Sequence, residues 1–405
     1  MSNKQNINSY KDDNKIGLFS ATIICINAMI GVGIFATPAK LATTVGPAGI
    51  ITYLFVIAAV FFMALSIARV AQYYPQAGSF YTYAKQWGGH NIGIIAAGSY
   101  IIGVIIGLGL ITQIAAEYFH TALPYLSSNT YGIVIVAAIT LLNVMGVKVV
   151  QTGQIALLGC TLFALISTMI LGFSNASFNN LFPFMPYGYF SLAKATSAAI
   201  FAFFGFESAA SLFHIVKQPE KNIPKALLLS LLVVGTLYIT FIGAIILAIP
   251  AKAFASQDTT LPEVLISYFP KYAWIAKLIG IAILTALLGV LQSMIYSVSM
   301  LTQSFLKLLN NKTAQNIANN KSGFKNIVYA LGLFILLNFF LLKNKSIFFN
   351  LTALFIISAF GLSIMTLIVK RHNKTFWQTI TTYLGLITAF LIFISAAISL
   401  TTEIL

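Results

Sequence analysis

The chain has 405 residues, of which 59% are hydrophobic and only 8% are charged, and its mean hydropathy is +0.91. Soluble domains carry about 25% charged residues, so the composition excludes a soluble protein and predicts an integral membrane protein. The formal net charge is +15, from 23 Lys and Arg against 8 Asp and Glu. Because the basic residues lie in short segments between apolar runs, membrane topology and anionic lipid headgroups explain this excess better than a nucleic-acid partner.

Apolar runs long enough to cross a bilayer recur along the chain, and we expect each to form one helix of an all-α polytopic membrane protein. In chain order the eleven runs cover residues 16–38, 46–73, 91–119, 130–147, 153–173, 192–213, 226–249, 272–303, 326–342, 346–369 and 376–400. The first run is longer than the core of a signal peptide, and no small-residue cleavage site follows it. We therefore expect a retained first span.

The distribution of lysine and arginine predicts the orientation. With the N-terminus inside, 16 of the 23 basic residues fall in inner segments, as the positive-inside rule requires. We expect a cytoplasmic N-terminal tail over residues 1–15 and, after an odd number of crossings, a C-terminus outside. The same bias favours a bacterial inner membrane as the location.

Residues that could carry metal or covalent chemistry are few. Cys25 and Cys160 both fall inside apolar runs, where we expect each to be a small buried residue rather than part of a disulfide framework or metal site. The four histidines are scattered near the ends of the runs, and no nucleotide-binding loop is present. The sequence therefore predicts neither an enzyme nor an ATP-driven pump, and it predicts no cofactor and no metal.

Glycines interrupt the first apolar run. Residues 27–35 read Asn-Ala-Met-Ile-Gly-Val-Gly-Ile-Phe, which places Gly31 and Gly33 at membrane depth. Glycine weakens a helix, and unwound backbone is tolerated in a membrane only where it lines a cavity or is buried in protein. A broken membrane helix points to a transporter's substrate site; close helix packing is the alternative explanation.

The sixth run has a comparable interruption. It reads Phe-Ala-Phe-Phe-Gly-Phe-Glu over residues 201–207, so Gly205 weakens the helix and Glu207 places a carboxyl group deep in an apolar segment. A charge at the membrane centre costs about 2.5–3.5 kcal/mol on insertion scales, so we expect Glu207 to face a cavity or a partner. The alternative is a packing glycine beside a carboxyl group that bonds neighbouring backbone.

The two interrupted runs lie five runs apart. Five crossings invert the second half relative to the first, and matching breaks in the two halves indicate a midplane site between inverted repeats. We expect a first repeat over residues 16–173, a second over residues 192–369 and an extra eleventh helix over residues 376–400. In the third run, Gly103 and Gly107 form a Gly-xxx-Gly pair that indicates a close helix contact.

Four motifs follow one another between residues 16 and 226. They read Ile30-Gly-Val-Gly-Ile-Phe35, Pro75-Gln-Ala-Gly-Ser-Phe-Tyr-Thr-Tyr83, Phe203-Phe-Gly-Phe-Glu207 and Gln218-Pro-Glu-Lys-Asn-Ile-Pro-Lys225. Together they resemble the amino acid–polyamine–organocation (APC) superfamily of secondary transporters. The resemblance implies a leucine-transporter-type core of two inverted five-helix repeats, and an α-amino acid as substrate.

The resemblance also implies how a substrate would be held. Backbone N–H groups around Gly31, Val32 and Gly33 would meet its carboxylate, since a helix N-terminus favours an anion. Backbone C=O groups near Ala28 and Phe201–Phe204 would meet its ammonium group. The candidate substrate-binding residues are Asn27, Ala28, Ile30, Gly31, Val32, Gly33, Phe201, Ala202 and Phe204, and the candidate coupling or gating residues are Gly205 and Glu207. Val32 and the Phe-rich sixth run favour a neutral or apolar amino acid.

The chain departs from the family pattern at several positions. Arg69 stands where the family often has an acidic residue, and Val32 replaces a small polar residue. Some sodium-coupled relatives use hydroxyl groups in helix 8, where this chain has Gly289 and Val290. Some proton-coupled members use a lysine in helix 5, at the position that corresponds to Cys160. Neither coupling device is therefore visible.

These observations predict a secondary active transporter of amino acids that works by alternating access, with proton symport preferred and sodium still open. Glu207 would act as a proton carrier or as a hinge anchor. An amino acid exchanger and a polyamine carrier are alternatives, although a polyamine carrier would need more acidic residues in its pocket. A membrane sensor that binds an amino acid without moving it is the alternative of another class. The expected partners are the amino acid and membrane lipids, not nucleic acid.

Overall fold

The computed structural model describes residues 15–145, 147–213, 215–254, 261–320, 322–341, 344–373 and 375–404. The expected tail lies outside this range, apart from its last residue. The α-helices in chain order are α1 (Leu18–Met29), α2 (Val32–Thr44), α3 (Gly49–Tyr73), α4 (Ser79–Ala122), α5 (Ser128–Val144), α6 (Val147–Ser174), α7 (Phe190–Phe201), α8 (Ser208–Ser211), α9 (Pro219–Ala248), α10 (Leu261–Tyr268), α11 (Ala273–Leu308), α12 (Lys312–Asn319), α13 (Gly323–Leu341), α14 (Lys345–Val369) and α15 (Phe376–Ile404).

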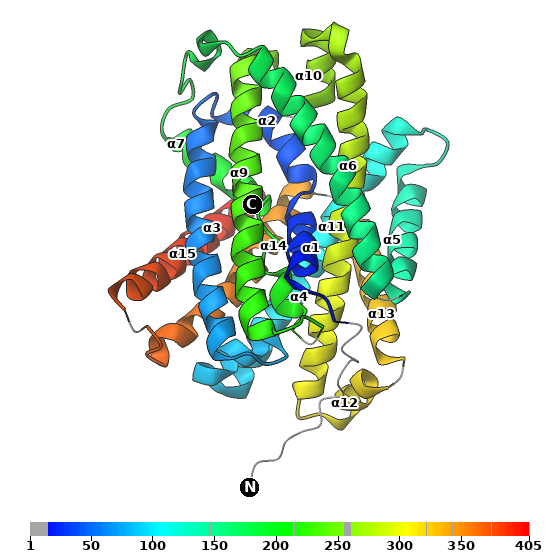
Figure 1. Ribbon diagram of the computed structural model, residues 1–405, viewed down its shortest axis with the longest axis vertical. Helices are drawn as coiled ribbons and strands as arrows, with labels where there is room; N and C mark the ends of the chain where they lie inside the picture. The colour runs from blue at the N-terminus through cyan, green and yellow to red at the C-terminus, as the bar shows by residue number, and fades with distance from the viewer. Residues whose placement is uncertain are drawn as a thin grey trace.

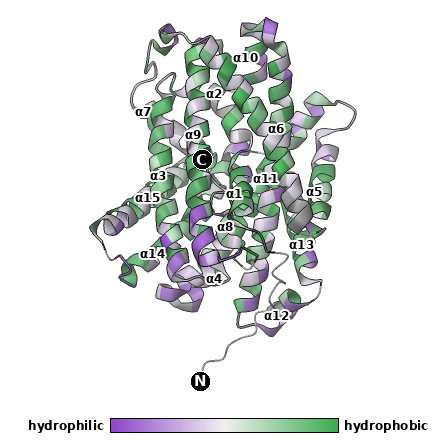
Figure 2. Cartoon of the chain, viewed as in Figure 1, coloured by the Kyte–Doolittle hydropathy of each residue, from purple (hydrophilic) through white to green (hydrophobic). Residues whose placement is uncertain are grey.

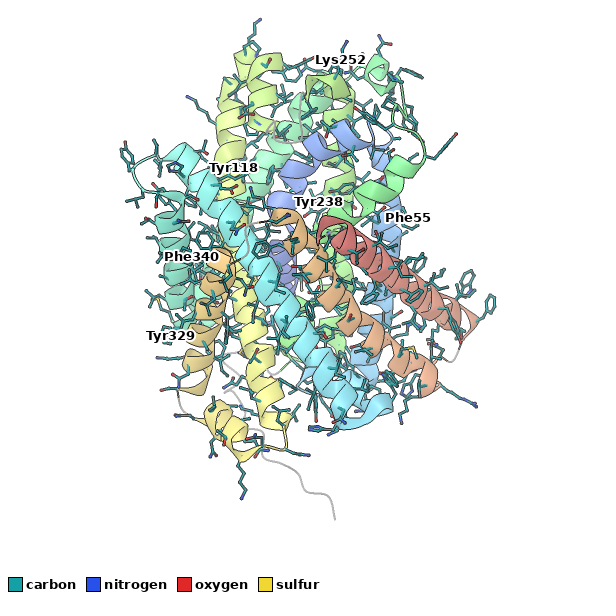
Figure 3. The ribbon with its side chains drawn as sticks, turned by 180° about the vertical axis from the view of Figure 1, so that it is seen from behind. Phe55, Tyr118, Tyr238, Lys252, Tyr329 and Phe340 are labelled. Atoms are coloured by element: carbon teal, nitrogen blue, oxygen red, sulfur yellow. The ribbon has the colours of Figure 1, made fainter. Side chains whose placement is uncertain are left out.

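The long helices form a bundle whose middle is apolar and whose two ends are more polar (Figures 1 and 2). Eight helices of the described chain are long and apolar enough to cross a membrane, and α1 and α5 are shorter apolar helices. Large apolar side chains such as Phe55 and Phe340 remain 54% and 46% exposed at the edges of the bundle (Figure 3). Many other large apolar side chains are exposed as well, as expected for a surface that contacts membrane lipid. The prediction of an all-α polytopic membrane protein is confirmed.

Each of the eleven expected runs coincides with a helix or, for the first and sixth runs, with a pair of helices. The largest differences lie at two N-terminal boundaries. α4 starts at Ser79 because a helical segment before Gly89 continues into the expected span. The two parts meet at a kink at Gly89, whose φ of 73° favours glycine. α9 starts at Pro219, where the missing N–H of proline suits the first turn of a helix.

The C-terminal helix α15 packs against α3 and α14. Arg69 on α3 fixes its first turn: the guanidinium donates hydrogen bonds to the Gln378 carbonyl at 2.7 Å and to the side-chain oxygens of Asn373 and Thr382 at 3.3 Å each. Hydrogen bonds from a charged donor are worth about 1.5–3 kcal/mol each. Arg69, one of the positions at which the chain departs from the family pattern, therefore anchors the extra helix.

The helices that surround the centre of the bundle belong to both halves of the chain. α1 packs against α6, α9 and α11, α2 packs against α7, and α4 packs against α14 along much of its length. The start of α1 is tied to the chain after α8, since the Ile16 N–H donates to the Ile215 carbonyl at 2.7 Å and the Lys217 N–H donates to the Ile16 carbonyl at 2.9 Å. These contacts bring the first and sixth runs together.

Candidate substrate site

The first run is broken where its glycines predict. α1 ends at Met29 and α2 begins at Val32, with Ile30 and Gly31 between them in non-helical conformations. A Cβ atom on Gly31 would lie 2.9 Å from Cγ2 of Val290, and one on Gly33 would lie 3.0 Å from Cβ of Ala202. Larger residues at either position would push the break away from α11 or from the end of α7.

The second break is longer. α7 ends at Phe201 and α8 begins at Ser208, and the six residues between them form turns. Gly205 has a φ of +114°, and a Cβ atom there would lie 2.6 Å from both the C and O atoms of Ala28. Gly205 therefore meets two requirements that only glycine satisfies: a backbone conformation that L-residues avoid, and direct backbone contact with α1.

Tyr238 on α9 connects the two breaks, a contact that the sequence analysis did not predict. Its hydroxyl group lies 2.8 Å from the Met29 carbonyl and 3.1 Å from the Ala202 carbonyl, and it is positioned to donate to either. Tyr238 is completely buried and lies in the interior of the bundle (Figure 3). One hydroxyl group thus lies within hydrogen-bonding distance of the last residue of α1 and of the residue that follows α7.

Glu207 is completely buried at the end of the second break. Its Oε1 atom accepts a hydrogen bond from the Tyr100 hydroxyl of α4 at 3.0 Å, and its Oε2 atom accepts one from the Gly205 N–H at 3.0 Å. Both donors are neutral, so they give the carboxyl group partners without an opposite charge. The expectation that Glu207 faces a partner is confirmed, and the bond to Gly205 agrees with the alternative of a carboxyl group that holds neighbouring backbone.

A cavity lies between the two breaks and the helices α4, α11 and α14. The residues that line it are Ala28, Met29, Gly31, Gly33, Val104, Gly107, Leu108, Ile111, Phe201, Ala202, Phe204, Val290, Met294, Thr352 and Ile356. Apolar lining with a few polar groups, here mostly backbone, is typical of small-molecule sites.

Six of the nine candidate substrate-binding residues line this cavity: Ala28, Gly31, Gly33, Phe201, Ala202 and Phe204. Of the other three, Ile30 is buried within the break, Val32 begins α2, and Asn27 is buried with its Oδ1 atom toward α11, 3.2 Å from where a Cβ on Gly289 would lie. Direct contact of these residues with a substrate stays a prediction.

The structure changes two details of the expected substrate contacts. The Gly31 N–H donates a hydrogen bond to the Met29 carbonyl at 2.9 Å, so this N–H is already paired. The carbonyls of Met29 and Ala202 both lie within reach of Tyr238. The N-terminus of α2, which begins at Val32, keeps the orientation that favours an anion.

The cysteine predictions divide. Cys25 is buried, as expected, and its Sγ atom accepts a hydrogen bond from the Ala209 N–H at 3.2 Å. Cys160 is exposed, so the expectation of burial was wrong. The face of α6 that meets α11 carries Leu157 instead, whose Cβ lies 3.8 Å from a Cβ built on Gly289. Small residues occur on both the inner and the outer face of α6, so the sequence did not indicate which face is buried.

Sequence reasoning missed the wall of the cavity that α4 and α14 form. Gly103 and Gly107 mark this contact, because Cβ atoms there would lie 2.9 Å from Ile356 and 3.1 Å from Thr352. The Gly-xxx-Gly pair was therefore a correct signal for close packing. It does not reveal which helix is the partner. Among the described residues, no cluster of three or more His, Cys, Asp or Glu could hold a metal ion.

The fold and the site define an α-helical membrane protein with two broken helices around a central cavity. Its fold is similar to that of MhsT, solved in complex with L-phenylalanine, with a TM-score of 0.67, 15% sequence identity and coverage of 94% of this chain and 98% of that chain. This likeness confirms the leucine-transporter-type fold.

Residues 16–402 match the family model described as amino acid permease. The chain belongs to this family, which is part of the APC superfamily, and the resemblance seen in the motifs is confirmed.

Characterised relatives differ in what their names say they carry. The branched-chain amino acid permease BcaP of Bacillus subtilis is 28% identical over 302 residues, which cover 70% of this chain and 64% of that relative. The glutamate/serine transporter AimA of the same organism is 28% identical, over 57% of this chain and 48% of AimA. The low-affinity putrescine importer PlaP of Escherichia coli K12 is 27% identical, over 53% of this chain and 50% of PlaP. The matches thus span less than two thirds of the length of each of these relatives.

Proposed function

We propose that this protein is a secondary active transporter that carries neutral, mainly apolar amino acids across the membrane by alternating access. The observation that carries the proposal is the apolar cavity between the two helix breaks. Discontinuous helices at midplane bind the charged ends of a substrate through their backbone. Among the described residues that line the cavity, none has an acidic or basic side chain, which disfavours a polyamine or a charged amino acid.

In this proposal the main-chain groups of the amino acid lie at the breaks. The N-terminus of α2 and the backbone around Gly33 receive the carboxylate, where the helix dipole favours an anion. Backbone carbonyl groups near Ala28 and Phe204 receive the ammonium group. Phe201, whose ring centroid lies 4.5 Å from that of Phe349, forms an aromatic wall above them.

Alternating access requires the broken halves to move relative to the rest of the bundle. α1 and α8 are joined by the Ala209–Cys25 hydrogen bond and by the bonds of Ile16 to the chain after α8. α2 and α7 are joined through the contact between Gly33 and Ala202. Each break therefore separates two pairs of half-helices, and Ile30–Gly31 and residues 202–207 act as the hinges.

A test uses the purified protein in liposomes and a panel of labelled amino acids, with and without an inward proton gradient. We expect neutral apolar amino acids to accumulate when the gradient is present. Uptake that requires amino acid preloaded inside the liposomes would instead indicate an exchanger. Uptake of putrescine but of no amino acid would favour a polyamine carrier, and binding without uptake would favour a sensor.

We propose further that a proton drives uptake and that Glu207 carries it. Glu207 is buried, lies beside the second break, and is bonded to both Gly205 and Tyr100, so a change in its protonation alters contacts of the hinge and of α4 together. Glu207→Gln keeps the shape and one acceptor oxygen but cannot ionise. We expect this variant to lose the stimulation of uptake by a proton gradient while it still exchanges internal for external amino acid.

The matched control for this variant is Glu117→Gln. Glu117 lies on the same helix as Tyr100 but is 50% exposed and forms a surface ion pair with Lys345 at 2.6 Å, which contributes about 0–1 kcal/mol. We expect its pH response to equal that of the wild type. A Glu207→Gln protein with an unchanged rate and an unchanged pH response would rule out the proposed role. Placement in a bacterial inner membrane, with the N-terminus in the cytoplasm, is part of the same proposal.

A further inference from the structure

Of the described residues that line the cavity, Thr352 alone has a side chain with an oxygen or nitrogen atom. It lies on α14 and is 2% exposed. Its Oγ1 atom has no hydrogen-bond partner among the described residues. A buried hydroxyl group without a partner destabilises a protein. Because Thr352 lines the cavity, its unpaired hydroxyl group indicates a partner that a bound ligand supplies.

The position of Thr352 decides which part of a ligand it meets. One wall of the cavity is formed by the breaks, where Gly31 lies against Val290 and Gly33 lies against Ala202. Another wall is formed by α4 and α14, where a Cβ on Gly107 would lie 3.1 Å from Cγ2 and 3.4 Å from Oγ1 of Thr352. The breaks offer backbone groups and the α4–α14 wall offers Thr352. A substrate whose main-chain groups lie at the breaks therefore directs its side chain toward Thr352.

We propose that Thr352 is a specificity-determining residue whose hydroxyl group binds a hydroxyl group on the side chain of the substrate. The transporter then takes up L-threonine in addition to apolar amino acids of the same size, such as L-valine. The inference rests on the proposed function, since it assumes that the cavity is the substrate site. It adds a polar substrate to a site that its other lining residues would assign to apolar side chains alone.

Valine differs from threonine by one methyl group in place of the hydroxyl group, so the two have nearly equal shape. The test uses this pair twice: as two competing substrates, and as the two residues compared at position 352. Unlabelled L-threonine and L-valine compete with labelled L-leucine for uptake into liposomes that contain the wild type or Thr352→Val. We expect L-threonine to compete about tenfold less well in the variant, with L-valine unchanged or slightly better. Thr352→Ser, which keeps a hydroxyl group, should restore competition by L-threonine.

The matched control is Thr140→Val. Thr140 on α5 is also buried and its Oγ1 atom also has no partner among the described residues, but it lies against Gly332 and not in the cavity. This variant should leave the ratio of L-threonine to L-valine competition unchanged. If a Thr-to-Val change merely disturbed folding, competition by L-threonine and competition by L-valine would change together.

Two outcomes would overturn the proposal. One is a wild-type protein that transports L-leucine and is inhibited by L-valine but not by L-threonine, a result that needs no variant to fold. The other is a Thr352→Val protein with an unchanged ratio of the two competitors. A wild-type protein that takes up none of these amino acids would instead overturn the proposed function itself.

Discussion

The two helix breaks of this protein line the same cavity but differ in local structure. The first is two residues long, Ile30 and Gly31, and a Cβ on Gly31 would meet the side chain of Val290 alone. Gly33, just inside α2, lies against both Cβ and Cα of Ala202. The second is six residues long, and Gly205 within it combines a φ of +114° with contact against the backbone of Ala28. At Gly31 the space is limited by one neighbouring side chain, whereas at Gly205 it is limited by backbone atoms and by the backbone conformation itself.

This difference matters for how each break tolerates change. A second substitution can shorten a neighbouring side chain that collides with a new Cβ atom, but no substitution removes a backbone atom. The two breaks are also coupled, because Gly205 contacts Ala28 and the Tyr238 hydroxyl group lies within hydrogen-bonding distance of a carbonyl group at each break. Substitutions at the two sites should therefore differ both in size of effect and in whether a second change rescues them.

The largest effect is expected for Gly205→Ala. The added Cβ would lie 2.6 Å from the Ala28 backbone, and alanine at a φ of +114° adds backbone strain of about 1–3 kcal/mol. We expect uptake below detection and a lower yield of folded protein, measured by liposome transport and by thermal unfolding in detergent. The control is Gly235→Ala on α9, where the nearest atom of Ile57 lies 3.5 Å away and no strain arises. Wild-type uptake by Gly205→Ala would show that the contact with α1 is dispensable.

Gly31→Ala is expected to have a large effect that can be reversed. Its Cβ would meet Cγ2 of Val290 at 2.9 Å, and overpacking of this kind costs about 1–3 kcal/mol. We expect uptake to fall by about tenfold or more. The double variant Gly31→Ala with Val290→Ala removes the colliding methyl group and should recover most of the activity, whereas Gly205→Ala with Ala28→Gly should not recover. Equal rescue at both breaks would contradict the distinction between side-chain and backbone contact.

Tyr238→Phe is expected to have the smallest effect of the three on uptake. It removes the hydroxyl group that bonds the Met29 and Ala202 carbonyls but keeps the buried ring. Since one hydrogen bond contributes about 0.5–1.5 kcal/mol, we expect uptake to fall by about two- to tenfold, with a modest loss of thermal stability. Tyr131→Phe is the control, because its hydroxyl group also donates to a carbonyl, that of Leu123, but at the chain segment between α4 and α5. Equal losses in the two variants would mean that the link between the breaks has no special role.

Much of the site could be predicted from local sequence. Gly31, Gly33 and Gly205 lie in long apolar runs, where glycine weakens a helix. Glu207 places a carboxyl group at a depth where its charge would be costly in lipid. These are properties of single residues in their own segments. They located both breaks, and six of the nine candidate substrate-binding residues line the cavity.

Other parts of the site depend on which segments meet. Tyr238 is one of 18 tyrosines, and its sequence neighbours do not distinguish it from the rest. Thr352 lines the cavity only because Gly107 lets α14 approach α4. Cys160 is exposed because α6 turns another face inward. Apolar residues occupy every side of a membrane helix, since lipid and protein interior are both apolar, so periodicity does not report which face is inside.

The sequence by itself therefore determined the membrane class, the eleven apolar runs, the family and the positions at which two helices break, because composition and glycine act locally. The tertiary structure decided how long each break is, how Gly205 meets Ala28, and which side chains from α4, α9 and α14 complete the site. Those outcomes depend on contacts between residues that lie far apart in the chain.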